Sequence, residues 1–174
     1  REYIHNYQKI LDGELYHLEN DTTIRKDNRA TMMEFYKYNK LQGVSVPRLV
    51  KQLGTLRLVS KYVDKSFTKA SREDYEAFIL HLMELKRSPA TVSTYMEILK
   101  VFHKWLEHTD TYPDCVRWMK CNGKKSKKLP ENLLTQDDVK LLLSHAKFTR
   151  DKALLAVLWE SGARVGEVGG MDIK

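Results

Sequence analysis

Apolar residues recur at spacings of three and four in five successive segments, and this pattern constrains the fold more than any other feature of the chain. That spacing places the apolar side chains on one face of a helix. It predicts helices over 3–18, 25–42 and 46–63, a fourth after Ser71 and a fifth from Ser88 to Leu106. With only 8 Gly and 4 Pro in 174 residues, the chain has few of the tight turns that an all-β fold requires. We therefore expect an all-α fold.

Start and stop signals flank these helices. Ser71 with Asp74 three residues later forms a capping-box pattern, and Ser88 precedes a proline in the first helical turn. Gly43 follows the second helix as a stop signal. Gly54 lies inside the third helix, where it costs about 1 kcal/mol relative to Ala and allows another helix to pack closely.

The chain changes character after residue 119. Residues 120–134 contain a glycine, a proline and five lysines with little apolar content, which is typical of a linker. Thr135 and Asp138 repeat the capping-box pattern. The nearly continuous apolar run 153–159 predicts a buried helix, which Gly162 ends. We expect an N-terminal amphipathic helix (1–21), a helical domain (22–119), a basic linker (120–134) and the incomplete start of a second domain (135–174).

Positive charge is concentrated in two zones. Residues 22–72 carry 12 basic and three acidic side chains, a net charge of +9, and residues 115–130 carry six basic side chains and no acidic one. The whole chain has a net charge of only +7, so the remainder is acidic. Two concentrated basic zones indicate a nucleic-acid partner, although solvated helix faces or a solubilising linker would give the same charges.

The third helix resembles the fifth when it is shifted by 43 residues. Two basic pairs match in this alignment, Arg57 with Lys100 and Lys61 with Lys104. The two cations on each helix are four residues apart and so share one face, away from the apolar stripe. Two similar basic faces would suit the backbone of a DNA duplex.

Several classes of protein are disfavoured. No apolar run is long enough to span a membrane, and no signal-peptide pattern follows Arg1. Five residues separate Cys115 from Cys121, which is neither a disulfide framework nor zinc spacing and fits a reducing compartment. The six histidines show no ligand spacing. We expect a cytoplasmic, DNA-associated protein with no metal site and no cofactor.

Arg164 follows the helix-stopping Gly162 by two residues, and Glu167 comes three residues later. An arginine held by a packed helix and a turn could bind two oxygens of one phosphate, and Glu167 could hold its guanidinium in place. A plain surface Arg–Glu pair would have the same spacing.

The segments around this pair resemble the opening of a tyrosine recombinase (integrase) catalytic domain. These domains typically show LT-x-[ED]-[ED]-V, then RD-x-A-LL, then G-[LA]-R-x-x-E, and this chain has LTQDDV, RDKALL and GARVGE in the same order across about 40 residues. The helix that starts at Ser88 and ends in FHKWL is similar to the last helix of the family's core-binding domain. Gly169-Gly170 departs from the larger apolar residue common at that point.

The resemblance implies a SAM-like four-helix core-binding bundle with an extra N-terminal helix, followed by the first helices of a mixed α/β catalytic domain. It assigns Arg164 as the catalytic arginine that grips the scissile phosphate, with Glu167 supporting it. Members cut and rejoin DNA through a 3′-phosphotyrosine, without metal. The tyrosine nucleophile and the other catalytic residues cannot be placed here, so we expect this chain to be inactive alone.

The resemblance and the basic zones together predict the contacts with double-stranded DNA. We expect contacts from Arg48, Lys51, Arg57, Lys61, Thr91, Lys100, Lys104, Lys124, Lys125, Lys127 and Lys128. Most would be phosphate contacts, which position the protein without reading sequence. We expect a monomer for this chain, whereas the full-length family works as a tetramer on DNA. Two alternatives remain open, a non-catalytic DNA-binding regulator and a helical protein-interaction module that docks through 3–18.

Overall fold

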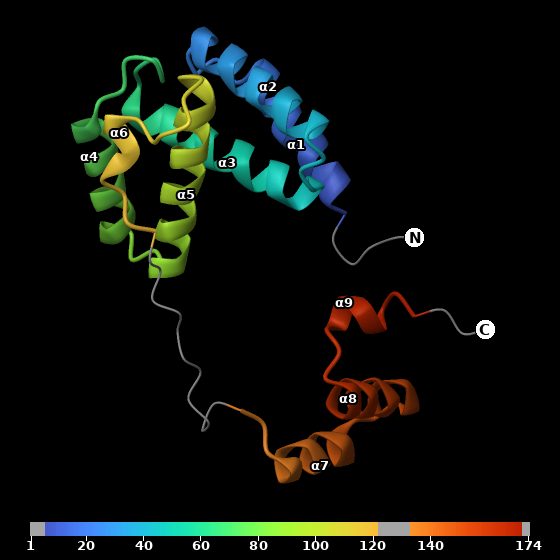
Figure 1. Cartoon of the computed structure of the whole chain (residues 1–174). Coiled ribbons are helices and arrows are strands. Elements are labelled where there is room, and N and C mark those ends of the chain that lie inside the picture. The colour runs from blue at the N-terminus through green and yellow to red at the C-terminus, as the bar shows by residue number, and fades with distance from the viewer. Residues whose placement is uncertain (1–5, 122–132, 172–174) are drawn as a thin grey trace. The chain divides into compact units, whose positions relative to one another are not determined.

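The computed structural model describes residues 6–121 and 133–171, and every regular element within these ranges is a helix (Figure 1). The all-α prediction is confirmed for this part of the chain. Helices α1 to α6 make one compact unit, and α7 to α9 make a second.

The first unit contains six helices among the described residues, of which the first five lie close to the predicted positions and the short sixth was not predicted. They are α1 (Tyr7–Asn20), α2 (Lys26–Leu41), α3 (Val46–Val63), α4 (Arg72–Glu84), α5 (Pro89–Leu106) and the short α6 (Asp114–Arg117). The ends agree with the sequence signals because short-range interactions set them. Ser71 and Asp74 form the predicted capping box, and the Ser88 hydroxyl oxygen accepts from the Thr91 N–H at 3.2 Å.

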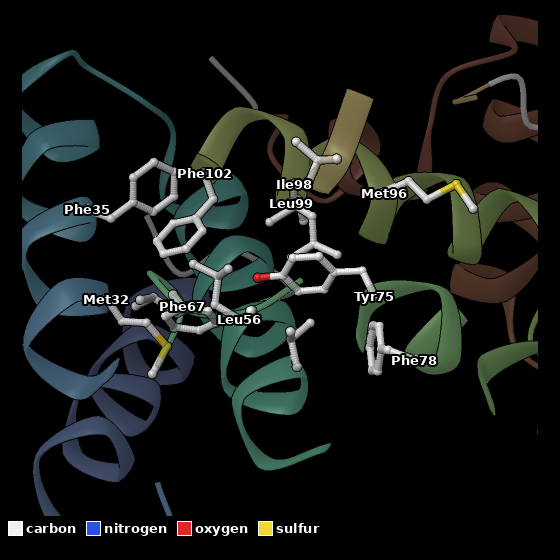
Figure 2. Packing of buried hydrophobic residues seen from close by; sticks show 14 of the residues in the cluster. Met32, Phe35, Leu56, Phe67, Tyr75, Phe78, Met96, Ile98, Leu99 and Phe102 are labelled. Carbon is white, nitrogen blue, oxygen red and sulfur yellow. The ribbon is translucent and has the colours of Figure 1, made fainter. Parts of the chain in front are cut away.

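Helix α3 is the centre of this unit. It packs against α1 and α2 on one side and against α4 and α5 on the other (Figure 1). The apolar stripes meet in one core that includes fully buried aromatic rings (Figure 2). The Phe35 and Phe67 rings both contact the Phe102 ring edge-on, with centroids 5.2 and 4.8 Å away. Helix α5 is thereby fixed against α2 and the loop after α3.

A buried asparagine joins α2 to the end of α3. The Asn28 amide nitrogen donates to the Ser60 hydroxyl and to the Lys65 carbonyl, both at 2.8 Å, and its oxygen accepts from the Phe67 N–H at 2.9 Å. Because every polar atom of this buried amide has a partner, it costs little to bury and fixes the loop that follows α3.

The glycines behave differently from one another. Gly43 adopts a left-handed conformation with φ +74°, as a stop signal requires. A Cβ atom built on Gly54 would meet nothing closer than the Glu14 Oε1 at 3.8 Å, which is ordinary van der Waals contact. Gly54 thus faces α1, as the expectation of close helix packing implies, but a methyl group would also fit at this position.

The second unit contains α7 (Gln136–His145), α8 (Thr149–Ser161) and α9 (Val165–Val168). Thr135 and Asp138 form the predicted capping box, and Gly162 ends α8 in a left-handed conformation. The prediction that residues 153–159 are buried is wrong for the described structure. Leu154, Val157 and Trp159 are each about two-fifths exposed, since α8 packs only on α7 and α9 among the described residues.

Among the described residues, no helix combines the length and the apolarity that crossing a membrane would require.

Candidate nucleic-acid interface

The first turns of α3 and the first half of α5 lie next to each other and carry three of the predicted DNA contacts. Arg48 and Lys51 are one turn apart on α3, and Thr91 and Tyr95 are one turn apart on α5. The Lys51 Nζ lies 5.1 Å from the centroid of the Tyr95 ring, a cation–π contact that joins the two helices. We call Arg48, Lys51, Thr91 and Tyr95 the α3–α5 patch.

The charges of this patch are available to a ligand. Neither Arg48 nor Lys51 has an ion pair with a described acidic residue. The Thr91 hydroxyl lies 2.9 Å from the Ser88 hydroxyl at the start of α5, which fixes its position. The patch therefore offers two cations and a hydroxyl without the cost of breaking a salt bridge. Tyr95 was not among the predicted contacts, and its proximity to Lys51 depends on the packing of α3 on α5.

Arg57 and Lys61 are engaged by acidic residues near α1. The Arg57 Nε and Nη2 donate to both carboxylate oxygens of Glu14, at 3.0 and 3.1 Å. The Lys61 Nζ lies 2.6 Å from an Asp21 carboxylate oxygen. Hydrogen bonds from Lys61 and then Thr23 hold the pKa of Asp21 well below its usual range, so this partner is charged at neutral pH.

Arg57 also lies on a different side of α3 from the α3–α5 patch. At 3.6 residues per turn, Arg57 lies about 120° around α3 from Lys51. The sequence placed Lys51, Arg57 and Lys61 in one DNA-facing set. In the structure, Arg57 and Lys61 instead pair with acidic residues in and just after α1 and so anchor α1 to α3.

Lys100 has a similar structural role on α5. Its Nζ donates to the Met119 carbonyl at 3.2 Å and lies 4.2 Å from the centroid of the Tyr112 ring. The matched cations of the internal similarity, Arg57 and Lys100, thus both hold a flanking segment against the bundle. Lys104 is half-buried and forms no ion pair with the acidic residues that the structure describes. Lys124, Lys125, Lys127 and Lys128 lie outside the described residues.

Arg164 and Glu167 form the predicted pair. One Glu167 oxygen accepts from the Arg164 backbone N–H at 2.8 Å, and the other accepts from the Arg164 Nη1 at 2.9 Å. These two hydrogen bonds, the backbone one first, lower the pKa of Glu167, which therefore stays ionised. The Arg164 side chain is 87% exposed, so its remaining donors can reach a phosphate.

A cluster that sequence reasoning missed lies between α4, α5 and α6. The Tyr75 hydroxyl lies 2.6 Å from His103 Nε2, and Cys115 Sγ lies 3.6 Å from His103 Nδ1. Burial lowers the pKa of His103 to about 4, so its ring is neutral and its 3.8 Å approach to Glu107 is not an ion pair. Burial and then the charge of Glu107 raise the pKa of Cys115 to about 11, and burial raises that of Tyr75. The sequence feature that could have pointed to this cluster is the four-residue spacing of His103 and Glu107.

Comparisons with known proteins find several relatives that are all tyrosine recombinases. Tyrosine recombinase XerA of Pyrococcus horikoshii is 29% identical over 150 residues, which cover 84% of this chain and 48% of XerA. Tyrosine recombinase XerD of Oceanobacillus iheyensis is 32% identical over 116 residues, 63% of this chain and 39% of XerD. Tyrosine recombinase XerC of Treponema denticola is 32% identical over 120 residues, 66% of this chain and 39% of XerC.

This chain therefore spans less than half of the length of each of these relatives. No protein-family model matches the chain, and no solved structure gives a significant match.

Proposed function

Since the chain is related to the tyrosine recombinases over most of its length, we propose that it is the DNA-binding portion of a site-specific recombinase of this kind. Residues 22–119 are the core-binding domain, with 1–21 as an added helix, 120–134 as a basic linker and 135–174 as the start of the catalytic domain. The partner is double-stranded DNA. The complete protein cuts and rejoins DNA through a 3′-phosphotyrosine.

The α3–α5 patch is the observation that carries this proposal. Arg48 and Lys51 supply two cations with no described acidic partner, and Thr91 supplies a hydroxyl at a helix start. Cations and hydroxyls of this kind bind phosphate oxygens and fix the register of a protein on the duplex. Lys104 and the four linker lysines contact further phosphates along the DNA backbone.

Arg164 takes the phosphate-gripping role in the catalytic part of the proposal. Its guanidinium donates to two non-bridging oxygens of the scissile phosphate and stabilises the charge that develops on them. Glu167 holds the guanidinium by accepting from its Nη1, and its second oxygen accepts from the Arg164 backbone N–H. The matched motifs supply no nucleophile, so the 174-residue chain binds DNA without becoming attached to it.

A salt titration of DNA binding tests the proposal. With about six phosphates neutralised, affinity falls roughly 10³-fold between 50 and 200 mM salt. The K51E variant loses much of the binding, whereas K37E, an equal change of charge on the exposed face of α2, changes it little. A flat salt response would refute the proposal, and equal losses in K37E and K51E would mean that net charge alone drives binding.

A suicide DNA substrate separates binding from chemistry. The chain shifts the substrate in a native gel but leaves no covalent adduct in a denaturing one. Capture of the substrate would show that a tyrosine of this chain acts as a nucleophile, which would overturn the assignment of its catalytic parts.

A further inference from the structure

Three side chains with metal-binding atoms converge where α5 meets α6. His103 and Glu107 are one turn apart on α5, and Cys115 lies on α6. The ligand atoms of the three residues all lie within 4.8 Å of one another. None of the three has a role in the DNA-binding proposal.

The distances within this cluster fit a tetrahedral zinc ion. With Zn–S about 2.3 Å and Zn–N about 2.0 Å, tetrahedral angles place a sulfur and a nitrogen ligand about 3.5 Å apart, and a nitrogen and an oxygen ligand about 3.3 Å apart. The Cys115 Sγ lies 3.6 Å from His103 Nδ1, and the Glu107 Oε1 lies 3.8 Å from the same nitrogen. The Cys115 Sγ and the Glu107 carboxylate oxygen lie within 4.8 Å of each other, so the half-exposed Glu107 side chain must turn toward the other two ligands to complete the site.

A second set of interactions orients the histidine for this role. The His103 ring is almost fully buried, and its other nitrogen, Nε2, lies 2.6 Å from the Tyr75 hydroxyl. Metal-binding histidines usually have such a partner on the second nitrogen, because it fixes the ring and leaves the first nitrogen free to bind the ion.

A path for the ion is also present. Cys115 lines a surface hollow of about 450 Å³ together with Arg72, Asp114, Arg117 and Trp118. The thiol therefore lies between the buried imidazole and solvent. An ion that enters from this side meets Cys115 before it reaches the buried His103.

We propose that His103 Nδ1, Cys115 Sγ and the Glu107 carboxylate bind a zinc ion, with the fourth position left to water. A thiolate, an imidazole and a carboxylate together favour Zn²⁺ over Mg²⁺ or Ca²⁺, which prefer oxygen ligands alone. Binding replaces the thiol proton of Cys115, which passes to solvent. The ion links α6 to α5 and fixes the segment by which the chain leaves the first unit.

Cobalt(II) substitution tests the site directly. The full chain is freed of metal with a chelator under reducing conditions and titrated with Co²⁺ alone. We expect one equivalent to bind, with the thiolate-to-cobalt charge-transfer band and the strong visible bands of a tetrahedral complex. Zn²⁺ should then displace the cobalt and abolish these bands.

Three variants identify the ligands. C115S removes the charge-transfer band, and E107Q weakens Co²⁺ binding but leaves the band detectable. C121S is the matched control, because Cys121 is the other free cysteine and its thiol is only part-buried in the same stretch of chain. Circular dichroism confirms that each variant is folded. No cobalt band in the folded wild type, or loss of the band in C121S but not in C115S, would overturn the proposal.

Tyr75 provides a further readout. The Y75F variant keeps the three ligands but removes the partner of His103 Nε2, so its zinc affinity falls about 10–100-fold. Zinc also raises the midpoint of thermal unfolding of the wild type but not that of C115S, since an ion that binds only the folded state stabilises it. Equal zinc affinities in Y75F and wild type would contradict the placement of the ion on His103 Nδ1.

Discussion

Neutralising the acidic partners of α3 should strengthen DNA binding by a calculable amount. The double variant E14Q/D21N removes the two carboxylates that engage Arg57 and Lys61. If the freed cations then contact phosphates, each adds about 0.9 to the slope of log affinity against log salt. The slope therefore steepens by up to about 1.8, which makes the loss of affinity between 50 and 200 mM salt about tenfold larger than in the wild type.

The variant has a structural cost that must be measured beside the binding. Glu14 accepts two hydrogen bonds from the part-buried Arg57 guanidinium, and losing its charge lowers the free energy of unfolding by about 1 kcal/mol. Loss of the Asp21–Lys61 pair adds to this cost. Urea denaturation followed by circular dichroism gives this value. Because the loss is small, the variant remains folded during the titration.

A matched control makes the result interpretable. E76Q/D114N changes the net charge equally and removes the carboxylate partners of Arg72 and Arg117, which belong to α4 and α6 instead of α3. Fluorescence anisotropy with one labelled duplex measures the salt slope of all three proteins. A wild-type slope in E14Q/D21N would show that Arg57 and Lys61 do not reach phosphates even without their carboxylate partners, and would refute this prediction. An equal steepening in the control would assign the effect to net charge.

Three further predictions concern the stability of the first unit. G54A raises the free energy of unfolding by about 0.5–1 kcal/mol, measured in urea, since the added methyl group meets Glu14 Oε1 at 3.8 Å without a clash. F102A lowers it by about 3–5 kcal/mol in the same assay, because this ring is fully buried between α2 and the loop after α3. The lowered pKa of Asp21 means that its pair with Lys61 stabilises the fold above the carboxyl's unfolded pKa of about 4. This stabilisation is lost as the pH falls below that value. The urea midpoints of wild type and D21N therefore approach each other in acid.

Each of these predictions has a clear contrary result. G13A, with open space around its Cβ atom in α1, should gain as much as G54A, so a loss confined to G54A would restore a packing role for Gly54. A loss below 1 kcal/mol in F102A would mean that the core rearranges around the missing ring. A constant difference between wild type and D21N from pH 7 to pH 2 would contradict the Asp21–Lys61 pair.

The boundaries of the helices follow from the sequence because short-range interactions set them. The capping boxes at Ser71 and Thr135 each involve residues three apart, and the left-handed glycines 43 and 162 end their helices locally. The Arg164–Glu167 pair belongs to the same class, since helical spacing alone brings the two side chains together. Within the described residues, these features match the pattern that the sequence predicts.

The burial of α8 could not be read from its sequence in the same way. An apolar run indicates that a helix has apolar surface to bury, but only the surrounding elements decide what covers it. In the described structure α7 and α9 contact α8, and its apolar side chains keep much of their exposure.

The basic zones show most clearly what the sequence determined and what tertiary structure decided. Sequence alone determined that residues 22–72 carry excess positive charge and that cations recur at matched positions on two helices. It could not determine which cations are free, because the Arg57–Glu14 pair joins residues 43 positions apart and the Lys100–Met119 contact joins residues 19 apart. Packing of α1 on α3 and of α6 on α5 decided those pairs, and the same packing brought Cys115 to His103. Contacts between distant segments form only when the core positions the helices, so free charge and candidate metal ligands became visible only in the folded chain.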